Sequence, residues 1–175
     1  MMWGAMKVVP YIRNGKVLVE TYFLIGRGDA DMIDLSLFTY KEAVELILGF
    51  YTFTLGYWED ELEEIPEAKR FVEMKFTKKD EENEDLHVLS KTGEKFLHEY
   101  IKSISEIFID HMKIKAFEMS YNETSRWFKE EFKLETDDDG EDIAEYICGN
   151  LYHYGYRGFK CYSSRRGKFY RIEQL

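Results

Sequence analysis

The chain has 175 residues, of which 45% are hydrophobic, 33% are charged and 17% are aromatic. This is the composition of a folded globular protein, and a chain of this length buries about 70% of the surface that its unfolded form exposes, so neither a cross-link nor a metal is needed for stability. The net charge of −10 excludes a protein that coats nucleic acid over its whole surface, because phosphates would repel most of that surface.

The two cysteines, Cys148 and Cys161, are too few for a disulfide framework. The first residues do not have the pattern of a secretory signal, since Pro10 interrupts their short apolar run. No apolar run approaches the roughly 20 residues that span a bilayer. We therefore expect a cytoplasmic protein with reduced thiols and without membrane association. Met1, Met2 and Met6 are alternative starts between which the sequence does not decide.

The first predicted element is a β-hairpin over residues 6–25. Its centre is Asn14-Gly15, the strongest short hairpin signal, because both residues of a type I′ turn need a positive φ. Pro10 has no amide proton to donate to a sheet, which places the first arm at an edge or a bulge. A loop rich in Gly and Asp follows over residues 25–36.

A mostly buried helix is predicted over residues 40–54. Thr39 and Glu42 have the spacing of a capping box, in which the two side chains satisfy the first free amides of a helix. Apolar residues such as Ala43 and Ile47 recur on one helical face, and further apolar residues widen that face.

The next stretch, residues 59–85, carries twelve acids against five cations, a net charge of −7. A short helix or two turns are predicted around Pro66. The alternation of apolar and charged residues over 71–76 is typical of a half-buried strand. A solvated turn over 78–85 and a returning strand over 86–90 complete a second hairpin.

A central core helix is predicted over residues 92–111, because its apolar residues recur at the spacings i, i+4, i+7 and i+11. These residues are Leu97, Ile101, Ile104 and Phe108. A strand over 112–119 is expected next. Ser120 and Glu123 then form a second capping box before a helix over 124–134.

The C-terminal stretch reverses its charge. Residues 129–145 carry nine acids against two lysines, a net charge of −7, whereas residues 157–175 carry six cations against Glu173, a net charge of +5. We expect a loop over 137–142, a helix over 141–154 and a third hairpin over 158–172.

Together these elements predict an α+β fold with three β-hairpins and four to five helices. A single domain of residues 1–175 is expected, with a sub-boundary near 119–122 that separates a hairpin and helix core (1–119) from a helix-helix-hairpin unit (120–175). The order of elements in that last unit is compatible with a winged-helix arrangement.

Motifs for metals and catalysis do not survive inspection. Glu135, Asp137, Asp139 and Gly140 match four positions of a calcium-binding EF-hand loop, but Tyr146 stands where the loop needs a bidentate Glu. Cys148, His153 and Cys161 lack the paired spacing and the fourth ligand of a zinc site. We therefore expect no metal and no cofactor, and we assign no catalytic residue.

The leading hypothesis is a non-catalytic module that binds a basic, nucleic-acid-handling protein, in the manner of an inhibitor, an immunity factor or an antagonist. Acids steer association with such a partner, and aromatic side chains supply contact energy. The expected contact residues are Tyr57, Trp58, Glu59, Asp60, Glu61, Glu63 and Glu64. The alternative interpretation of this stretch is a solvated face beside a core tryptophan.

A second hypothesis is a winged-helix-like regulator that contacts nucleic acid through its C-terminal hairpin. The cations available for phosphate contacts are Lys160, Arg165, Arg166, Lys168 and Arg171. The preceding helix argues against it, because that helix has three acids and no Lys or Arg, so these cations can instead neutralise the acidic block. A third hypothesis is an enzyme with an unmarked active site. The sequence does not indicate the oligomeric state.

Overall fold

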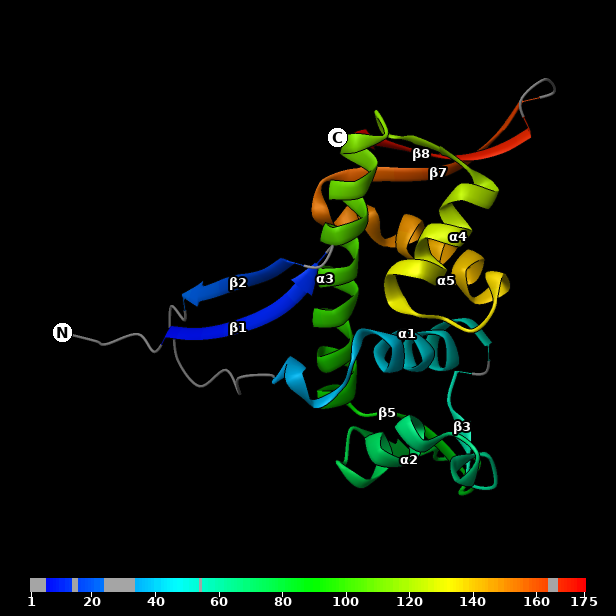
Figure 1. Ribbon diagram of the computed structural model, residues 1–175. Helices are drawn as coiled ribbons and strands as arrows, with labels where there is room; N and C mark the ends of the chain where they lie inside the picture. Colours follow the sequence, from blue (N-terminus) through cyan, green and yellow to red (C-terminus); the bar gives the residue numbers. More distant parts are fainter. Residues whose placement is uncertain (1–5, 14–15, 24–33, 54, 164–166) are drawn as a thin grey trace. The chain divides into compact units, whose positions relative to one another are not determined.

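A computed structural model describes residues 6–13, 16–23, 34–53, 55–163 and 167–175 (Figure 1). The fold is α+β as predicted, and the described residues form five α-helices and three β-hairpins. The chain divides into two compact units, Met1–Asp34 and Leu35–Leu175.

The first unit is a two-stranded antiparallel sheet of β1 (Met6–Arg13) and β2 (Lys16–Phe23). It confirms the predicted first hairpin. Pro10 lies in a strand with one neighbour, which is the position that its missing amide proton allows. The Asn14-Gly15 turn and most of the predicted loop over 25–36 lie outside the described residues.

The first half of the second unit begins with a 3-10 turn, η1 (Leu35–Leu37), and then runs helix, strand, two helices and a hairpin. These elements are α1 (Tyr40–Leu48) with its π-helical extension η2 (Gly49–Phe53), β3 (Tyr57–Trp58), the 3-10 helix η3 (Glu61–Glu63), α2 (Pro66–Glu73), β4 (Thr77–Lys79) and β5 (Leu86–Leu89). The three strands form an antiparallel sheet in the order β3-β5-β4.

The second half repeats this order of elements. It consists of α3 (Lys91–Ile114), β6 (Glu118–Ser120), α4 (Tyr121–Phe132), α5 (Asp137–Asn150), the 3-10 helix η4 (Leu151–Tyr154), β7 (Tyr156–Ser163) and β8 (Gly167–Gln174). The strand order is β6-β8-β7, so the last strand again lies in the middle. This order of helices and strands is compatible with the winged-helix arrangement predicted for the C-terminal part. The two halves meet between β5 and α3; the predicted sub-boundary near 119–122 stays a prediction.

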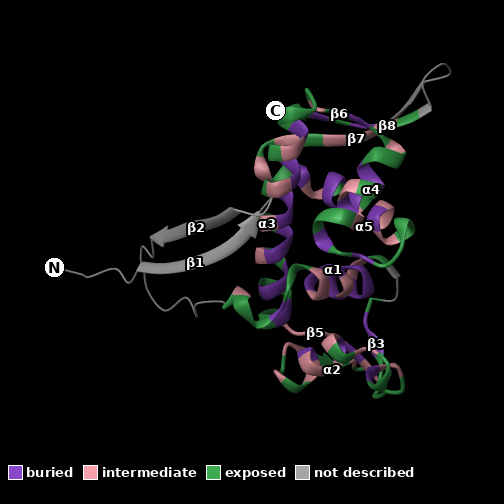
Figure 2. Cartoon of the chain, viewed as in Figure 1, coloured by how far each residue is buried: buried purple, intermediate pink, exposed green. Residues whose placement is uncertain are grey.

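Helix α1 joins the two halves, because it packs against α2, α3, α4 and α5 (Figure 1). Buried residues gather on the sides of these helices that face one another (Figure 2). The predicted capping box of Thr39 and Glu42 is present at its start. Val44, Leu46 and Ile47 have no exposed surface, and burial of each such side chain contributes roughly 1.5–3 kcal/mol.

Aromatic side chains fill the core of each half. In the first half Phe38 and Phe71 pack against each other and against Phe96 from the start of α3, with ring centroids 5.6–5.9 Å apart. In the second half Phe108 packs against Trp127 and Phe128 at 5.5 and 4.9 Å. Stacked, tilted and edge-to-face pairs at these distances add about 0.5–1.5 kcal/mol beyond burial. The high aromatic share of the sequence is therefore largely a property of the two cores.

The strand predicted over 71–76 is wrong. Phe71–Glu73 are the last residues of α2, which begins at Pro66, a residue suited to the first helical position because its ring fixes φ and its missing amide proton is not needed there. Phe71 is fully buried. The helix ends before Lys75, whose φ of 61° breaks the helical path, and β4 begins at Thr77. An alternation over six residues did not distinguish one face of a short helix from a strand.

The loop predicted over 137–142 is also wrong, because α5 begins at Asp137. The hydroxyl of Thr136 accepts a hydrogen bond of 3.1 Å from the amide of Asp139, and the Asp139 carboxylate accepts one of 3.0 Å from the amide of Thr136. The acids of this stretch therefore form the first turn of a helix, where the helix dipole favours negative charge. Cap chemistry thus decides the conformation of this acidic stretch.

Two further expectations around β6 are corrected. Helix α3 continues to Ile114, so the strand expected over 112–119 is reduced to Glu118–Ser120. Ser120 caps α4 through a hydrogen bond of 3.3 Å from the amide of Glu123. The Glu123 carboxylate does not complete a capping box; it accepts a hydrogen bond of 2.5 Å from Lys115 instead.

Candidate functional site

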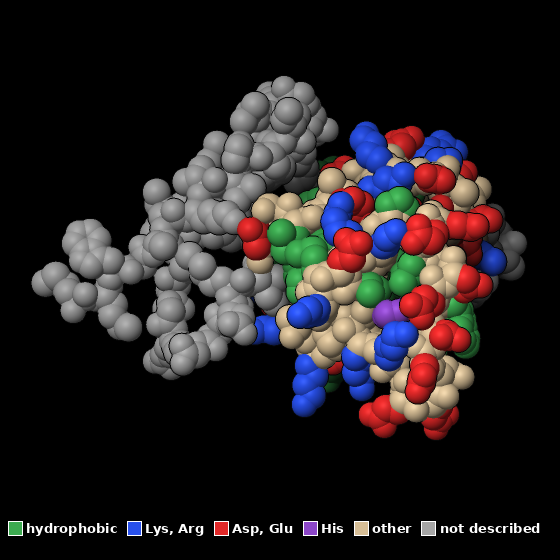
Figure 3. Space-filling view, turned by 90° about the horizontal axis from the view of Figure 1, so that it is seen from below, with side chains coloured by type: hydrophobic (Ala, Val, Ile, Leu, Met, Phe, Trp, Pro, Cys, Tyr) green, Lys and Arg blue, Asp and Glu red, His purple; other side chains and the backbone are tan. Residues whose placement is uncertain are grey.

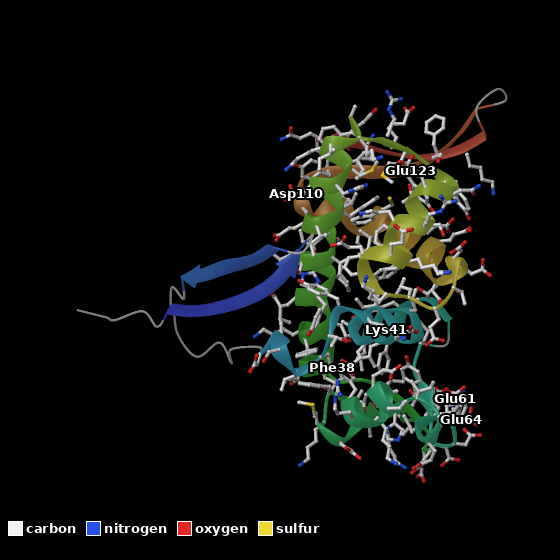
Figure 4. The ribbon with its side chains drawn as sticks, viewed as in Figure 1. Phe38, Lys41, Glu61, Glu64, Asp110 and Glu123 are labelled. Atoms are coloured by element: carbon white, nitrogen blue, oxygen red, sulfur yellow. The ribbon has the colours of Figure 1, made fainter. Side chains whose placement is uncertain are left out.

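A groove of about 660 Å³ lies in the second unit where three chain segments meet. These segments are the polar side of α1, the stretch from β3 through η3 to the start of α2, and the turn between α4 and α5. The residues that line it are Lys41, Glu42, Glu45, Gly49, Tyr57, Glu61, Glu64, Ile65, Pro66, Glu67, Glu135, Thr136 and Asp139. We call it the acidic groove. Figure 4 shows Lys41 on α1 and, below it, Glu61 at the start of η3 and Glu64 directly after η3.

The groove carries seven carboxylates against one ammonium group, a net charge of −6. Two of these carboxylates are paired with a cation. Among the described residues, the other five have no Lys or Arg partner within ion-pair distance: Glu45, Glu61, Glu64, Glu67 and Asp139. The groove is therefore a concave surface of uncompensated negative charge.

The two paired carboxylates lie at its edges. Glu135 accepts a hydrogen bond of 3.0 Å from Lys41, and this bond raises the pKa of Lys41. Glu42 accepts one of 2.9 Å from Arg70. Burial alone would raise the pKa of Glu42, but hydrogen bonds from Thr39 and Arg70 outweigh it and lower that pKa.

Glu45 lies at the centre of this charge. Its side chain is half-buried, and this burial is the main cause that raises the pKa of Glu45. Repulsion from Asp139 and Glu67 raises the pKa further, and attraction to Lys41 offsets only part of the increase. A carboxylate under this repulsion is stabilised by any cation that enters the groove. The electrostatic state of Glu45 thus favours a positively charged ligand.

Tyr57 forms the floor of the groove. Its side chain is 6% exposed, and its hydroxyl donates a hydrogen bond of 3.1 Å to the carbonyl of Glu45. Gly49 makes room for the ring, since a Cβ at that position would lie 2.0 Å from the Tyr57 hydroxyl oxygen. Burial raises the pKa of Tyr57, so the phenol stays protonated and acts as a hydrogen-bond donor.

The residues expected to contact a basic partner are divided by the structure. Tyr57, Glu61 and Glu64 line the acidic groove. Trp58 is 40% exposed beside it, and its amide donates a hydrogen bond of 2.9 Å to the Glu61 carboxylate. Asp60 is exposed.

Glu59 and Glu63 have partners within the fold. Glu59 is 3.1 Å from Lys79, and Glu63 is 2.7 Å from Lys69. Both pairs are exposed, and solvent screens exposed pairs so that they contribute little to stability. Their charge is therefore partly neutralised, in contrast to that of Glu61 and Glu64.

Sequence reasoning did not find the walls that α1 and the α4–α5 turn contribute. The available signal was the polar stripe Lys41, Glu42 and Glu45 on a helix that is otherwise apolar. Glu135 and Asp139 were considered only as calcium ligands, and the Asp139 carboxylate instead caps α5.

The cations of the C-terminal hairpin lie on both faces of its sheet. Lys160 and Lys168 are on the face turned toward α4, where their ammonium groups lie 4.6 and 5.1 Å from the centre of the Tyr121 ring. Arg171 is on the opposite face, 3.9 Å from Glu173. Arg165 and Arg166 lie outside the described residues.

Helix α5 occupies the position of a recognition helix in the winged-helix half. Its sequence has six acids and no Lys or Arg. Lys160 donates a hydrogen bond to Glu145 and lies 4.0 Å from Glu141. This lysine of the hairpin thus offsets part of the negative charge of α5, in line with one interpretation of the charge reversal.

Within the part of the chain that the structure describes, no group of three or more His, Cys, Asp or Glu side chains is arranged to hold a metal ion. None of the described helices is both long enough and apolar enough to cross a membrane.

Comparisons with protein-family models, with curated proteins and with solved structures found no match.

Proposed function

We propose that the chain is a non-catalytic protein-binding module whose acidic groove receives Lys or Arg side chains of a basic protein. The observation that carries this proposal is the set of five carboxylates without a cationic partner, which includes the half-buried Glu45. Guanidinium and ammonium groups form their strongest hydrogen bonds with carboxylates. A partner that brings such groups relieves the repulsion that raises the pKa of Glu45.

The size of the groove supports a macromolecular ligand with several cationic groups. Its volume of about 660 Å³ exceeds what one ammonium group fills. Trp58, 40% exposed at its side, offers an aromatic contact of the kind that dominates protein interfaces. Acids around such an anchor accelerate association with a basic surface. An inhibitor or antagonist of a nucleic-acid-handling protein would need both features.

The experiment is affinity capture from the native host, after nuclease treatment, with identification of bound proteins by mass spectrometry. The test variant carries Glu61→Lys, Glu64→Lys and Glu67→Lys in the groove. A control variant carries the same charge change on the exposed β4–β5 turn, as Glu81→Lys, Glu82→Lys and Glu84→Lys. We expect a basic protein that binds the natural sequence and the control but not the groove variant.

The purified partner then allows a direct measurement. Its affinity should fall as salt concentration rises, because screening weakens the contact between the groove and the cations. If the groove variant retains every captured protein, the proposal is wrong.

A second candidate is nucleic-acid binding through the β7–β8 hairpin, which the winged-helix connectivity of the second half favours. The neutralisation of Lys160 by Glu145 counts against it. Arg165→Glu with Arg166→Glu tests this candidate, since loss of a measurable DNA or RNA affinity with a reduced salt dependence would support it.

A further inference from the structure

Three exposed lysines lie on one face of α3 without a carboxylate partner. Lys91, Lys95 and Lys102, with His98 between them, follow the spacings 4, 3 and 4, which place them in one row along a helix. All four side chains are exposed. Among the described residues, none of these lysines is within ion-pair distance of an acid. We call this row the α3 basic face.

This absence of partners is informative because the chain has ten more acids than cations. Most other described cations are paired: Lys41, Lys69, Arg70, Lys78, Lys79, Lys113, Lys115, Lys129, Lys160 and Arg171 each lie within 4.0 Å of a carboxylate. Among the described residues, the lysines of the α3 basic face thus lack an ion-pair partner although acids are abundant. Figure 3 shows basic and acidic side chains interspersed on the described surface, with acidic ones most frequent along its right edge.

The geometry of the row suits a linear polyanion. At a rise of 1.5 Å per residue, Lys91 and Lys102 are about 16 Å apart along the helix axis. Lys75 adds a further exposed cation near the start of α3, since its carbonyl lies 3.5 Å from the hydroxyl of the N-cap Ser90. The helix dipole adds positive potential at the same end. Glu94 and Glu99 flank the row and are its nearest acids in sequence.

The chemistry of the face favours the phosphate backbone of a duplex. Single strands are held largely by stacking on aromatic side chains, and protein partners by aromatic anchors. Between Lys91 and Lys102, the aromatic side chains of Phe96 and Tyr100 are buried, which leaves His98 as the exposed ring. Exposed lysines without such anchors are typical of phosphate contacts that carry no sequence information.

We propose that the α3 basic face binds the sugar-phosphate backbone of double-stranded nucleic acid without sequence preference. This inference does not rest on the protein-binding function, because the acidic groove is formed by α1, η3, α2 and the α4–α5 turn. It also differs from binding through the β7–β8 hairpin, which uses other cations.

The test is fluorescence anisotropy with a labelled DNA duplex of random sequence, and with an RNA duplex of the same sequence, over a series of salt concentrations. We expect binding at low salt whose logarithmic salt dependence has a slope of about −3, since each neutralised phosphate contributes about −0.9. Comparable affinity for both duplexes indicates backbone recognition, and preference for one identifies which duplex is bound.

The decisive variant is Lys91→Gln with Lys95→Gln and Lys102→Gln. Its affinity should fall at least about tenfold, and its salt slope should approach zero. The matched control, Lys69→Gln with Lys79→Gln and Lys113→Gln, removes three exposed lysines that are paired with acids, and should bind nearly as the natural sequence does. Circular dichroism checks that both variants remain folded.

Several results would overturn the proposal. These are undetectable duplex binding at low salt, equal losses in the two triple variants, and a loss confined to a hairpin variant with Lys168→Gln and Arg171→Gln. Lysine-dependent binding of poly-glutamate without binding of either duplex would also overturn it, because the partner of the face would then be an acidic polypeptide.

Discussion

The hydroxyl of Tyr57 donates a hydrogen bond of 3.1 Å to the main-chain carbonyl of Glu45. This bond joins β3 to α1 beneath the acidic groove, so the residue with the most crowded carboxylate is fixed to the floor of the site. The Tyr57 ring also packs edge-to-face on Phe50 at 5.0 Å. The floor of the groove and the core of the first half are therefore continuous.

Gly49→Ala is expected to destabilise the protein. A methyl group at this position would lie 2.0 Å from the hydroxyl oxygen and 2.3 Å from Cζ of Tyr57, so the ring would have to move out of its packed position. Forced overpacking of this kind lowers the free energy of unfolding by about 1–3 kcal/mol. Urea denaturation measures the loss.

Gly149→Ala is the matched control for that substitution. A Cβ at Gly149 meets no atom within 4 Å, and the residue lies inside α5. Alanine is a better helix former than glycine, so this variant should gain up to about 1 kcal/mol. Equal effects of the two substitutions would show that the close approach of Tyr57 to Gly49 does not constrain the fold.

Glu45→Gln is expected to stabilise the protein near neutral pH. Burial, then repulsion from Asp139 and Glu67, raises the pKa of Glu45 in the folded state above its ordinary value of 4.5. The folded state therefore disfavours the ionised form, and the natural sequence loses stability as the pH rises through the raised pKa. The advantage of the glutamine variant should accordingly disappear below the ordinary value.

Urea denaturation at a series of pH values checks this prediction. Glu82→Gln, in the exposed β4–β5 turn, removes the same charge outside the groove and should change little at any pH. A gain from Glu45→Gln that persists after glutamates are protonated would indicate that packing, rather than charge, is responsible.

The sequence predicted the elements that have strong local signals. The apolar periodicity of Leu97 to Phe108 is a property of one helix, and the residues concerned are buried in α3. In the sequence, a glycine-containing turn and alternating residues on both sides of it indicated the third hairpin. By contrast, Phe71 belongs to α2, whereas the sequence predicted a strand there. Six residues of alternation fit both a short helix and a strand. The burial of the Phe71 ring depends on partners that are distant in the sequence.

The acidic groove could be predicted only in part. Glu61 and Glu64 belong to an acidic block that is visible in the sequence, and they do line the groove. Glu45 and Asp139 reach the same place from segments about 94 positions apart, and nothing local to either segment indicates that they repel each other. Tertiary packing brings these carboxylates together, so the composition of each segment alone does not show where negative charge is concentrated.

Thr136→Ala is expected to weaken the start of α5. The threonine hydroxyl accepts a hydrogen bond from the amide of Asp139, and its loss leaves that amide without its cap. Removal of such a cap lowers the free energy of unfolding by about 0.5–2 kcal/mol. Thermal unfolding should show the loss. Thr92→Ala, at an exposed position in the first turn of α3, is the control and should have a much smaller effect.

Lys91→Glu should raise stability and weaken duplex binding at once. Lys91 begins α3, where the positive end of the helix dipole disfavours a cation, so an acid there should add about 0.3–1 kcal/mol to the free energy of unfolding. The same residue starts the α3 basic face, so the anisotropy of a labelled duplex should report weaker binding. Lys113→Glu, in the last turn of the same helix, makes the same charge change with the opposite expected effect on stability. Equal shifts in unfolding for both variants would mean that the dipole does not determine them, and retained binding by Lys91→Glu would remove this lysine from the face.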